Sequence, residues 1–338
     1  MRHSAVSKIS SAQGRKPAFQ PIGDPISIEE FAADVRRGLT KDGQKELYSK
    51  YLYDDVGSAL FDVITTLPEY GLFRADARLL RRHSASLAAA VGRPSLVIEL
   101  GSGSGSKTRW ILSELAVKQP IAYCPVDISE AALHRCWLEL GYIDSVSIIP
   151  IAQSYLDGMD QALRLRPAGT SVLVLFLGST IGNFDPDRAR EFLTAVRHAL
   201  EPGDVFYLST DLEKDLNRMI AAYDDPIGAT AAFNLNLLAR INRDLGGNFD
   251  LSQFRHEARY DTRAHRIEMH LRSTRNQSVS VGKDLAVRFK RGETIWTESS
   301  YKFQRHDIRE LAHATGFKCQ AQWVDEEWPF AQSVLRVL

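Results

Sequence analysis

The feature that most constrains this sequence is a largely apolar segment, Leu96–Leu100, that runs directly into a turn rich in glycine and serine, residues 101–106. The segment has the length of a strand and the character of a buried strand in a parallel sheet. The turn suits the first strand-to-helix connection of a doubly wound sheet, where glycines let the backbone approach a ligand closely. A second predicted strand ends at Asp127, 26 residues after Gly101, near the spacing at which an acidic residue meets a ribose hydroxyl. Together the two strands predict a ligand that contains a nucleoside.

The spacing of the glycines narrows the class of ligand. Gly101, Gly103 and Gly105 are spaced G-x-G-x-G, which departs from the G-x-G-x-x-G spacing of dinucleotide-binding folds. Glu99 precedes the loop, where it would repel a pyrophosphate but suit a cationic ligand. The pattern resembles the first motif of Rossmann-like methyltransferases, whose S-adenosylmethionine carries an ammonium and a sulfonium and no phosphate. We therefore expect S-adenosylmethionine as the cofactor, with a nicotinamide oxidoreductase as the alternative.

Composition is that of a globular enzyme. A length of 338 residues allows one or two domains with an ample core. Lys plus Arg and Asp plus Glu each number 42, so the global charge gives no reason to expect nucleic acid or an anionic membrane as a partner. The apolar run 172–177 is far too short to span a bilayer, and the first residues lack the apolar core of a signal peptide. Three cysteines without a C-x-x-C pair, and no metal-ligand spacing, predict a reduced, cytoplasmic chain without a metal.

Strands and helices alternate from residue 95 onward, which predicts a parallel sheet with right-handed crossovers. Strands are expected at 95–100, 121–127, 146–151, 171–177 and 204–209, and helices at 106–117, 129–139, 186–200 and 306–315. The pattern then changes, because residues 215–246 look mostly helical and 251–303 look like meandering strands. The predicted fold class is α/β, a Rossmann-like class I methyltransferase sheet with a second, inserted α+β domain that binds the substrate.

The predicted domain organisation has three parts. We expect a mobile extension at 1–26, a substrate-binding domain at 27–74 and 213–298, and a Rossmann-like domain at 75–212 and 299–338. A capping box at Ser27–Glu30 predicts a helix through about Leu39, and a basic helix is expected from Ala75 to Val91. Residues 48–74 are rich in aromatics and glycine, a poor pattern for a simple helix, and predict a lid or pocket wall.

Several short motifs together resemble one known family, the histidine-specific N-alpha-methyltransferases of ergothioneine biosynthesis. They occur in the family's order over about residues 27–338, at Tyr53–Phe61, Leu67–Tyr70, Phe176–Asn183, Ala222–Asp225, Thr230–Asn234, Ile267–Met269 and Thr297–Ser300. The resemblance implies that S-adenosylmethionine methylates the α-amine of histidine three times, giving the betaine hercynine. It implies a small amino acid as the substrate, and we expect a monomer.

The resemblance also implies roles for individual residues. Those expected at the cofactor are Gly101, Lys107, Asp127, Ser154 and Tyr155, with Asp127 on the ribose hydroxyls. Those expected at the substrate are Tyr53 and Phe61 near the methylated nitrogen, Tyr70 in the pocket wall, Asn183 and Tyr223 on the α-carboxylate, and Met269, Glu298 and Ser300 around the side chain. The carboxylate and hydroxyl of the last two would pair with the imidazole nitrogens.

Two positions depart from the family pattern. Gly71 and Leu72 stand where a second tyrosine and a proline are expected after Tyr70, which bears on the lid and on the choice of substrate. Residues 153–155 stand where an acidic residue usually meets the adenine. The alternatives are therefore the same chemistry on another amino acid or a substituted histidine, such as a tryptophan-type acceptor or a ring nitrogen, and a catalytically silent relative that binds ligand.

Overall fold

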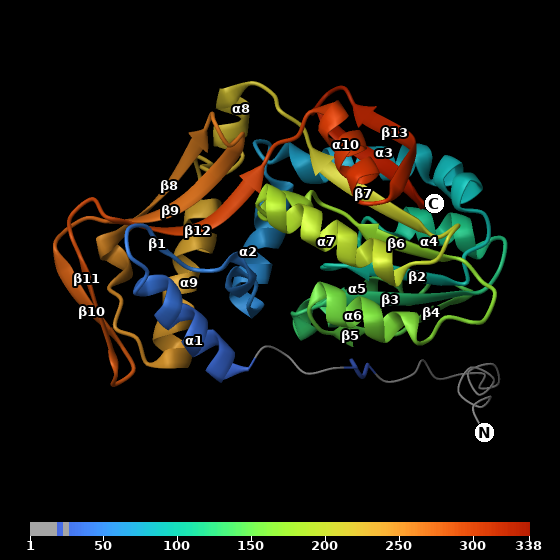
Figure 1. The fold of residues 1–338 in the computed structure, drawn as a ribbon. Coiled ribbons are helices and arrows are strands. Elements are labelled where there is room, and N and C mark those ends of the chain that lie inside the picture. Colours follow the sequence, from blue (N-terminus) through green and yellow to red (C-terminus); the bar gives the residue numbers. More distant parts are fainter. Residues whose placement is uncertain (1–18, 23–26) are drawn as a thin grey trace.

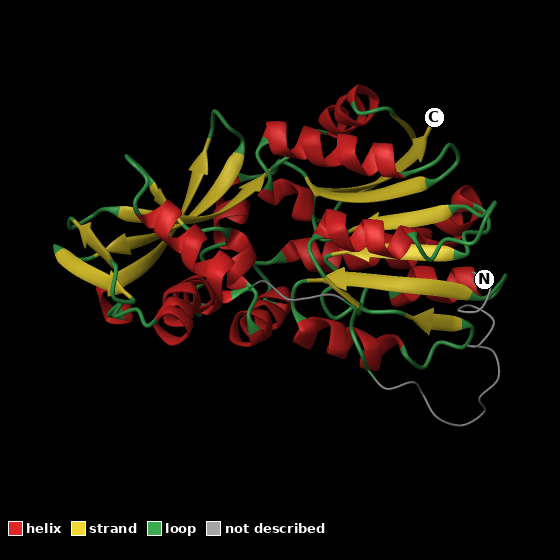
Figure 2. Ribbon diagram, turned by 60° about the horizontal axis from the view of Figure 1, so that its bottom comes forward, coloured by secondary structure: helices red, strands yellow, loops and turns green. Residues whose placement is uncertain are grey.

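The computed structural model of the chain describes residues 19–22 and 27–338, and the described part forms two packed units around separate sheets (Figure 1). The larger unit is an eight-stranded sheet. In Figure 2 its strands lie between helices on both faces, whereas the smaller unit beside it has its own sheet and helices. The predicted α/β class with a second α+β unit is confirmed.

The larger sheet has the strand order β13–β14–β7–β6–β2–β3–β4, with short β5 beside β3. Its strands are β2 (Leu96–Leu100), β3 (Ile121–Asp127), β4 (Val146–Ile148), β5 (Ile151–Ala152), β6 (Val172–Phe176), β7 (Val205–Asp211), β13 (Phe317–Asp325) and β14 (Phe330–Val337). The strands from β2 to β7 pair in parallel, whereas β14 is antiparallel to both β7 and β13. The direction of winding reverses between β2 and β6, the place where doubly wound sheets bind their ligands.

Helices cover both faces of this sheet because its strands are apolar on both sides. One layer contains α3 (Gly71–Val91), α4 (Arg109–Ala116) and α5 (Glu130–Leu140), and the other contains α6 (Tyr155–Leu163), α7 (Pro186–Ala199) and α10 (Arg305–Ala314). Successive side chains of β2 enter opposite layers, so Val97 packs with the first and Ile98 with the second. Burial on both faces explains why the strand shows no polar alternation.

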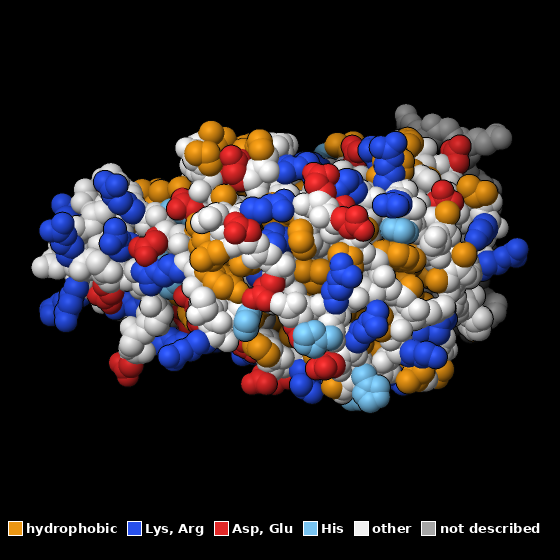
Figure 3. All heavy atoms as spheres, turned by 90° about the horizontal axis from the view of Figure 1, so that it is seen from above, with side chains coloured by type: hydrophobic (Ala, Val, Ile, Leu, Met, Phe, Trp, Pro, Cys, Tyr) orange, Lys and Arg blue, Asp and Glu red, His pale blue; other side chains and the backbone are white. Residues whose placement is uncertain are grey.

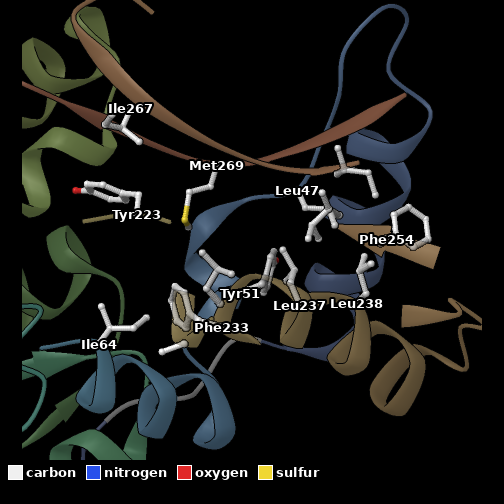
Figure 4. Packing of buried hydrophobic residues seen from close by; sticks show 14 of the residues in the cluster. Leu47, Tyr51, Ile64, Tyr223, Phe233, Leu237, Leu238, Phe254, Ile267 and Met269 are labelled. Carbon is white, nitrogen blue, oxygen red and sulfur yellow. The ribbon is translucent and has the colours of Figure 1, made fainter. Parts of the chain in front are cut away.

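The smaller unit is built on a four-stranded sheet of order β1–β12–β9–β8. Its strands are β1 (Lys45–Glu46), β8 (Phe254–Asp261), β9 (Arg266–Ser273) and β12 (Thr294–Tyr301), beside a separate hairpin of β10 (Gln277–Val281) and β11 (Leu285–Phe289). Its helices are α1 (Ile28–Leu39), α2 (Asp55–Thr66), α8 (Leu216–Ala221) and α9 (Ala229–Leu245), with the short 3-10 turns η1 (Ser49–Leu52) and η3 (Leu251–Gln253). Figure 4 shows Phe233 and Leu237 of α9 beneath the sheet, with Met269 extending from β9 toward Phe233.

Most predicted elements are present, but the prediction for residues 48–74 is wrong in one respect. Residues 55–66 form a regular helix, α2, although their pattern argues against a simple helix. The Asp54 side chain caps it by accepting a hydrogen bond from the Gly57 backbone at 2.8 Å. Gly57 is required there because a Cβ would lie 1.7 Å from the Leu52 carbonyl oxygen. The capping aspartate was the local signal for this helix.

Two predicted boundaries also differ from the structure. Strand β12 continues to Tyr301 in the smaller sheet, so the boundary expected after residue 298 falls inside a strand. Most of the predicted mobile extension, 1–26, lies outside the described residues. Within its described part, Ile22 pairs with Ile151 at β5, where the Ile22 amide donates to the Pro150 carbonyl at 2.9 Å.

Candidate functional site

A cavity of about 440 Å³ lies between the carboxyl ends of the larger sheet's strands and the smaller unit. Every residue to which the sequence assigned a cofactor or substrate role lines it. These are Gly101, Lys107, Asp127, Ser154 and Tyr155 at one end, and Tyr53, Phe61, Tyr70, Asn183, Tyr223, Met269, Glu298 and Ser300 at the other. The fold therefore joins two groups of residues that come from separate units and distant parts of the chain.

The glycine loop forms the first end of the cavity from backbone. Gly101, Gly103 and Gly105 all have positive φ angles, of 70°, 53° and 68°, which favour glycine. A Cβ on Gly105 would lie 2.6 Å from the Cys136 sulfur, and one on Gly101 would lie 3.3 Å from the Tyr155 ring. Side chains larger than hydrogen are therefore disfavoured at Gly101 and Gly105, and the loop lines the cavity with glycine backbone and small serines.

Asp127 lies at the end of β3 beside this loop. One carboxylate oxygen accepts from the Gly103 amide and the other from the Ser129 amide, each at 3.0 Å. Burial raises the pKa of Asp127, although the backbone hydrogen bonds oppose this effect. Each oxygen still has a free lone pair, so the carboxylate can accept further hydrogen bonds, as a pair of ribose hydroxyls would require.

Glu99 has a different setting from the one the sequence suggested. Its buried carboxylate accepts hydrogen bonds from Thr108 at 2.7 and 2.8 Å and from the Tyr123 hydroxyl. Burial raises the pKa of Glu99 to about 7, while these donors oppose the rise. Glu99 lines the cavity, but its carboxylate already accepts from two protein hydroxyls, that of Thr108 at the start of α4 and that of Tyr123 in β3.

Lys107 is held in place by a residue that the sequence reasoning missed. Its ammonium donates to Asp76, a fully buried residue of α3. The same carboxylate accepts from the Gly178 amide at 3.0 Å, from Ser209 at 2.7 Å and from Gln332 at 2.6 Å. Asp76 thus ties the end of the cavity that contains the glycine loop to the turn after β6. A lone aspartate in a basic helix carries no signal that would have identified it.

Aromatic rings packed edge to face form part of the cavity wall. Tyr53 and Phe61 have ring centroids 5.5 Å apart, and Phe61 lies 6.0 Å from Tyr70. Phe233 of α9 lies 5.4 Å from Tyr53 and completes this wall. Phe233 belongs to the Thr230–Asn234 motif but was not singled out, because an apolar helix residue is more often part of the core.

The second end of the cavity carries polar groups in contact with one another. Asn183, in the 3-10 turn η2 (Thr180–Asn183), donates to Glu298 at 3.4 Å, and the Tyr223 hydroxyl lies 2.6 Å from the Ser300 hydroxyl. Glu298 is 9% exposed, and burial raises its pKa to about 7. Buried polar groups of this kind need directional partners, which an amino-acid ligand can supply.

The two departures from the family pattern have different surroundings. A Cβ on Gly71 would lie 2.1 Å from the Trp328 ring, so this glycine accommodates Trp328 and does not line the cavity. Leu72 does line the cavity. Ser154 and Tyr155 line the same end of the cavity as the glycine loop. The Ser154 hydroxyl already donates a hydrogen bond to the Asp157 carboxylate at 2.6 Å.

The described residues contain neither a cluster of metal ligands nor a membrane-spanning helix. Among residues 19–22 and 27–338, no group of three or more His, Cys, Asp or Glu side chains is placed to hold a metal ion. Over the same residues, no helix combines the length and apolar character needed to cross a membrane. Acidic and basic side chains are interspersed on the face shown in Figure 3.

Comparison with known proteins agrees with the geometry. A family described as histidine-specific, SAM-dependent methyltransferases matches residues 31–337. A histidine N-alpha-methyltransferase of Mycolicibacterium smegmatis is 41% identical, over 91% of this chain and 95% of that protein. That of Mycobacterium tuberculosis is 41% identical over 93% and 97%, and ergothioneine biosynthesis protein 1 of Schizosaccharomyces pombe is 29% identical over 82% and 37%. This chain therefore belongs to the family of S-adenosylmethionine-dependent, histidine-specific methyltransferases.

Proposed function

We propose that this chain is an N-alpha-methyltransferase that converts L-histidine to its trimethylated betaine, hercynine. The observation that supports the acceptor is the buried Glu298 carboxylate, which lines the cavity with Ser300 two residues further along β12. Alternate residues of a strand face the same side. A carboxylate and a hydroxyl placed in this way can pair with the two imidazole nitrogens, whereas an indole or phenyl ring would leave the carboxylate buried and unsatisfied.

The cofactor end has the features that S-adenosylmethionine requires. The loop 101–105 offers backbone at three glycines, with only small serine side chains between them, and Asp127 retains free lone pairs for the ribose hydroxyls. We assign Lys107, Ser154 and Tyr155 to the same end, because they line it. When bound, S-adenosylmethionine supplies a methyl group, activated by its sulfonium, that the amine takes by in-line displacement.

The acceptor's α-carboxylate would be held by the Asn183 amide and the Tyr223 hydroxyl. Both side chains line the cavity and both are hydrogen-bonded to the groups assigned to the imidazole, Glu298 and Ser300. The carboxylate and the imidazole of histidine would thus be bound at one end of the cavity, and its α-amine would project toward the aromatic wall. Fixing the α-amine in this way accelerates methyl transfer, because an oriented nucleophile loses little further entropy on reaching the transition state.

The aromatic wall would accept the amine in each state of methylation. Tyr53 and Phe61 stand at the boundary between the two ends of the cavity, with Tyr70 and Met269 beside them. Burial raises the pKa of Tyr53 and of Tyr70 well above its usual value, so both hydroxyls stay protonated and orient the amine by hydrogen bonding. A π face continues to attract a quaternary ammonium that can no longer donate a hydrogen bond, which suits three successive methylations.

We further propose that the enzyme acts as a cytoplasmic monomer on this small acceptor. All three cysteines are free thiols, which suits a reducing compartment. For the domains, we propose a substrate-binding domain at 27–74 and 213–302, which extends our first boundary because β12 runs to Tyr301, and a Rossmann-like domain at 75–212 and 303–338.

A panel experiment tests the function. The purified chain would be incubated with S-adenosylmethionine and each amino acid in turn, and products would be identified by mass spectrometry. We expect successive additions of one, two and three methyl groups to the α-nitrogen of histidine alone. Methylation of tryptophan in preference to histidine, methylation of a ring nitrogen, or binding of histidine without turnover would each contradict the proposal.

A further inference from the structure

A buried lysine, Lys302, lies directly behind the acceptor end of the cavity. It is the residue after β12, its side chain is fully buried, and it is not part of the cavity wall. Its ammonium nitrogen lies 3.0 Å from a carboxylate oxygen of Asp211, 2.8 Å from the Ser300 hydroxyl and 3.0 Å from the Tyr223 hydroxyl. An ammonium has three donors and no acceptor. Each of its N–H groups therefore has one partner, and two of the three partners are acceptor-site hydroxyls.

Counting hydrogens shows what the lysine does to those hydroxyls. Tyr223 and Ser300 each carry one hydroxyl hydrogen, and their oxygens are 2.6 Å apart. Both oxygens accept from Lys302, so one hydroxyl hydrogen lies between the two oxygens and the other is left to point away from the pair. While the two hydroxyls bond each other, the pair therefore offers one donor hydrogen to the cavity, either from Tyr223 or from Ser300, and it offers both when a ligand replaces that mutual bond.

We propose that Lys302 is a positioning residue for the acceptor, which holds the Tyr223–Ser300 pair as a hydrogen-bond donor toward groups that carry a free lone pair. Such groups are the α-carboxylate and the unprotonated nitrogen of a neutral imidazole, whereas an imidazolium offers only hydrogens and adds a second cation near the ammonium. This inference rests on the proposed function, since it concerns how the same site selects its substrate and the protonation state of that substrate.

The charges around Lys302 support this role. Asp211 of β7 and Glu298 of β12 both raise the pKa of Lys302, against a larger lowering by burial. In return, Lys302 lowers the pKa of Glu298, which burial raises to about 7. The other titratable groups whose electrostatics involve Glu298 are four phenols, Tyr53, Tyr70, Tyr155 and Tyr223. Lys302 is thus the charged group that opposes protonation of the acceptor-site carboxylate, Glu298.

The chain contains a matched control for the loss of this cation. Lys214 is also buried and bonds the other oxygen of Asp211 at 2.6 Å, but its further contacts are the Leu212 carbonyl and the Trp328 ring. It contacts neither Tyr223 nor Ser300. Lys302→Met and Lys214→Met therefore each remove one buried cation from the same carboxylate, and only the first removes the donor from the hydroxyl pair.

The test compares the two variants in the full-length enzyme. We expect Lys302→Met to raise the KM for histidine at least about tenfold, the scale of a lost hydrogen bond to a charged group. S-adenosylhomocysteine affinity should remain within about twofold of the native value, and Lys214→Met should keep both quantities within about twofold. In addition, the acidic limb of kcat/KM should move to higher pH in Lys302→Met only, because the pKa of Glu298 rises when the ammonium is gone.

The outcomes separate this inference from the function on which it rests. A native enzyme that does not methylate histidine would refute the proposed function. An active native enzyme in which Lys302→Met and Lys214→Met give the same KM and the same pH profile would overturn the role of Lys302. If Lys302→Met does not fold, the test uses a double variant instead. It combines Lys302→Met with Asp211→Asn, so the buried ammonium and its carboxylate partner are removed together. A double variant that binds no S-adenosylhomocysteine would also overturn the proposal, since Lys302 would then serve the fold.

Discussion

The two ends of the cavity are built in different ways. The cofactor end is built around the backbone of one short stretch, Gly101–Gly105, with Asp127 at the next strand end. The acceptor end consists of side chains from η2, α9, β9, β12 and the residues around α2 and α8, many of which bond one another. A backbone site depends on conformation, whereas a side-chain site depends on which polar groups are satisfied. Substitutions should therefore affect the two ends separately and by different mechanisms.

The largest effect is expected where selectivity depends on a single buried charge. Glu298→Ala should reduce the ratio of kcat/KM for histidine over tryptophan, by an amount that corresponds to several kcal/mol. The variant lacks the carboxylate that accepts from an imidazole N–H and that an indole would leave unpaired. The ratio is measured in both forms of the enzyme, with S-adenosylhomocysteine affinity as the control that the cofactor end is intact. An unchanged ratio would show that Glu298 does not recognise the side chain.

The corresponding change at the cofactor end is Asp127→Ala. We expect it to weaken S-adenosylmethionine binding by about 1–3 kcal/mol, the scale of lost hydrogen bonds to a charged group, and to leave the KM for histidine nearly unchanged at saturating cofactor. Calorimetry measures the binding. Asp160→Ala is the matched control, because Asp160 is an exposed carboxylate of α6 whose partner is Arg164. Equal losses in both variants, or a change confined to histidine, would contradict the separation of the two ends.

Gly71 tests whether a departure from the family pattern concerns the acceptor or the packing. Gly71→Ala should lower the free energy of unfolding by about 1–3 kcal/mol, because its Cβ would overlap the Trp328 ring. It should leave the preference for histidine over tryptophan unchanged, since Gly71 does not line the cavity. Chemical denaturation measures the loss, and adding Trp328→Leu should give a total smaller than the sum of the two single changes. A change in acceptor preference would place Gly71 in the acceptor site instead.

The smallest effect concerns the free energy of unfolding that is lost by burying the Glu298 carboxylate. Burial raises the pKa of Glu298 to about 7 from its usual 4.5, so the folded state binds the proton more tightly than the unfolded state. The native protein therefore loses stability as pH rises from about 4.5 through 7. Glu298→Gln removes this charge and should raise Tm by about 2 °C at pH 8, with the gain vanishing below about pH 5. A Tm difference that does not vary with pH would indicate that Glu298 is ionised without cost.

The sequence predicted the larger unit in detail because its signals are local. A buried parallel strand is apolar over a few consecutive residues, and a glycine loop with positive φ leaves its mark at the residues that need it. The strands at 96–100, 121–127 and 172–176 lie within a residue of their expected bounds. The acceptor residues came from a resemblance across dispersed motifs, and the structure brings all of them to one cavity.

By itself, then, the sequence determined the fold class, the glycine loop and the set of residues that line the cavity. Only the tertiary structure decided what stands behind them. Three such contacts join segments from distant parts of the chain: Asp76 beneath Lys107, Lys302 beneath Tyr223 and Ser300, and Trp328 against Gly71. No local pattern encodes such pairs, because a buried charge is stabilised by whichever donors the fold brings within hydrogen-bonding distance, however far apart they lie in the chain.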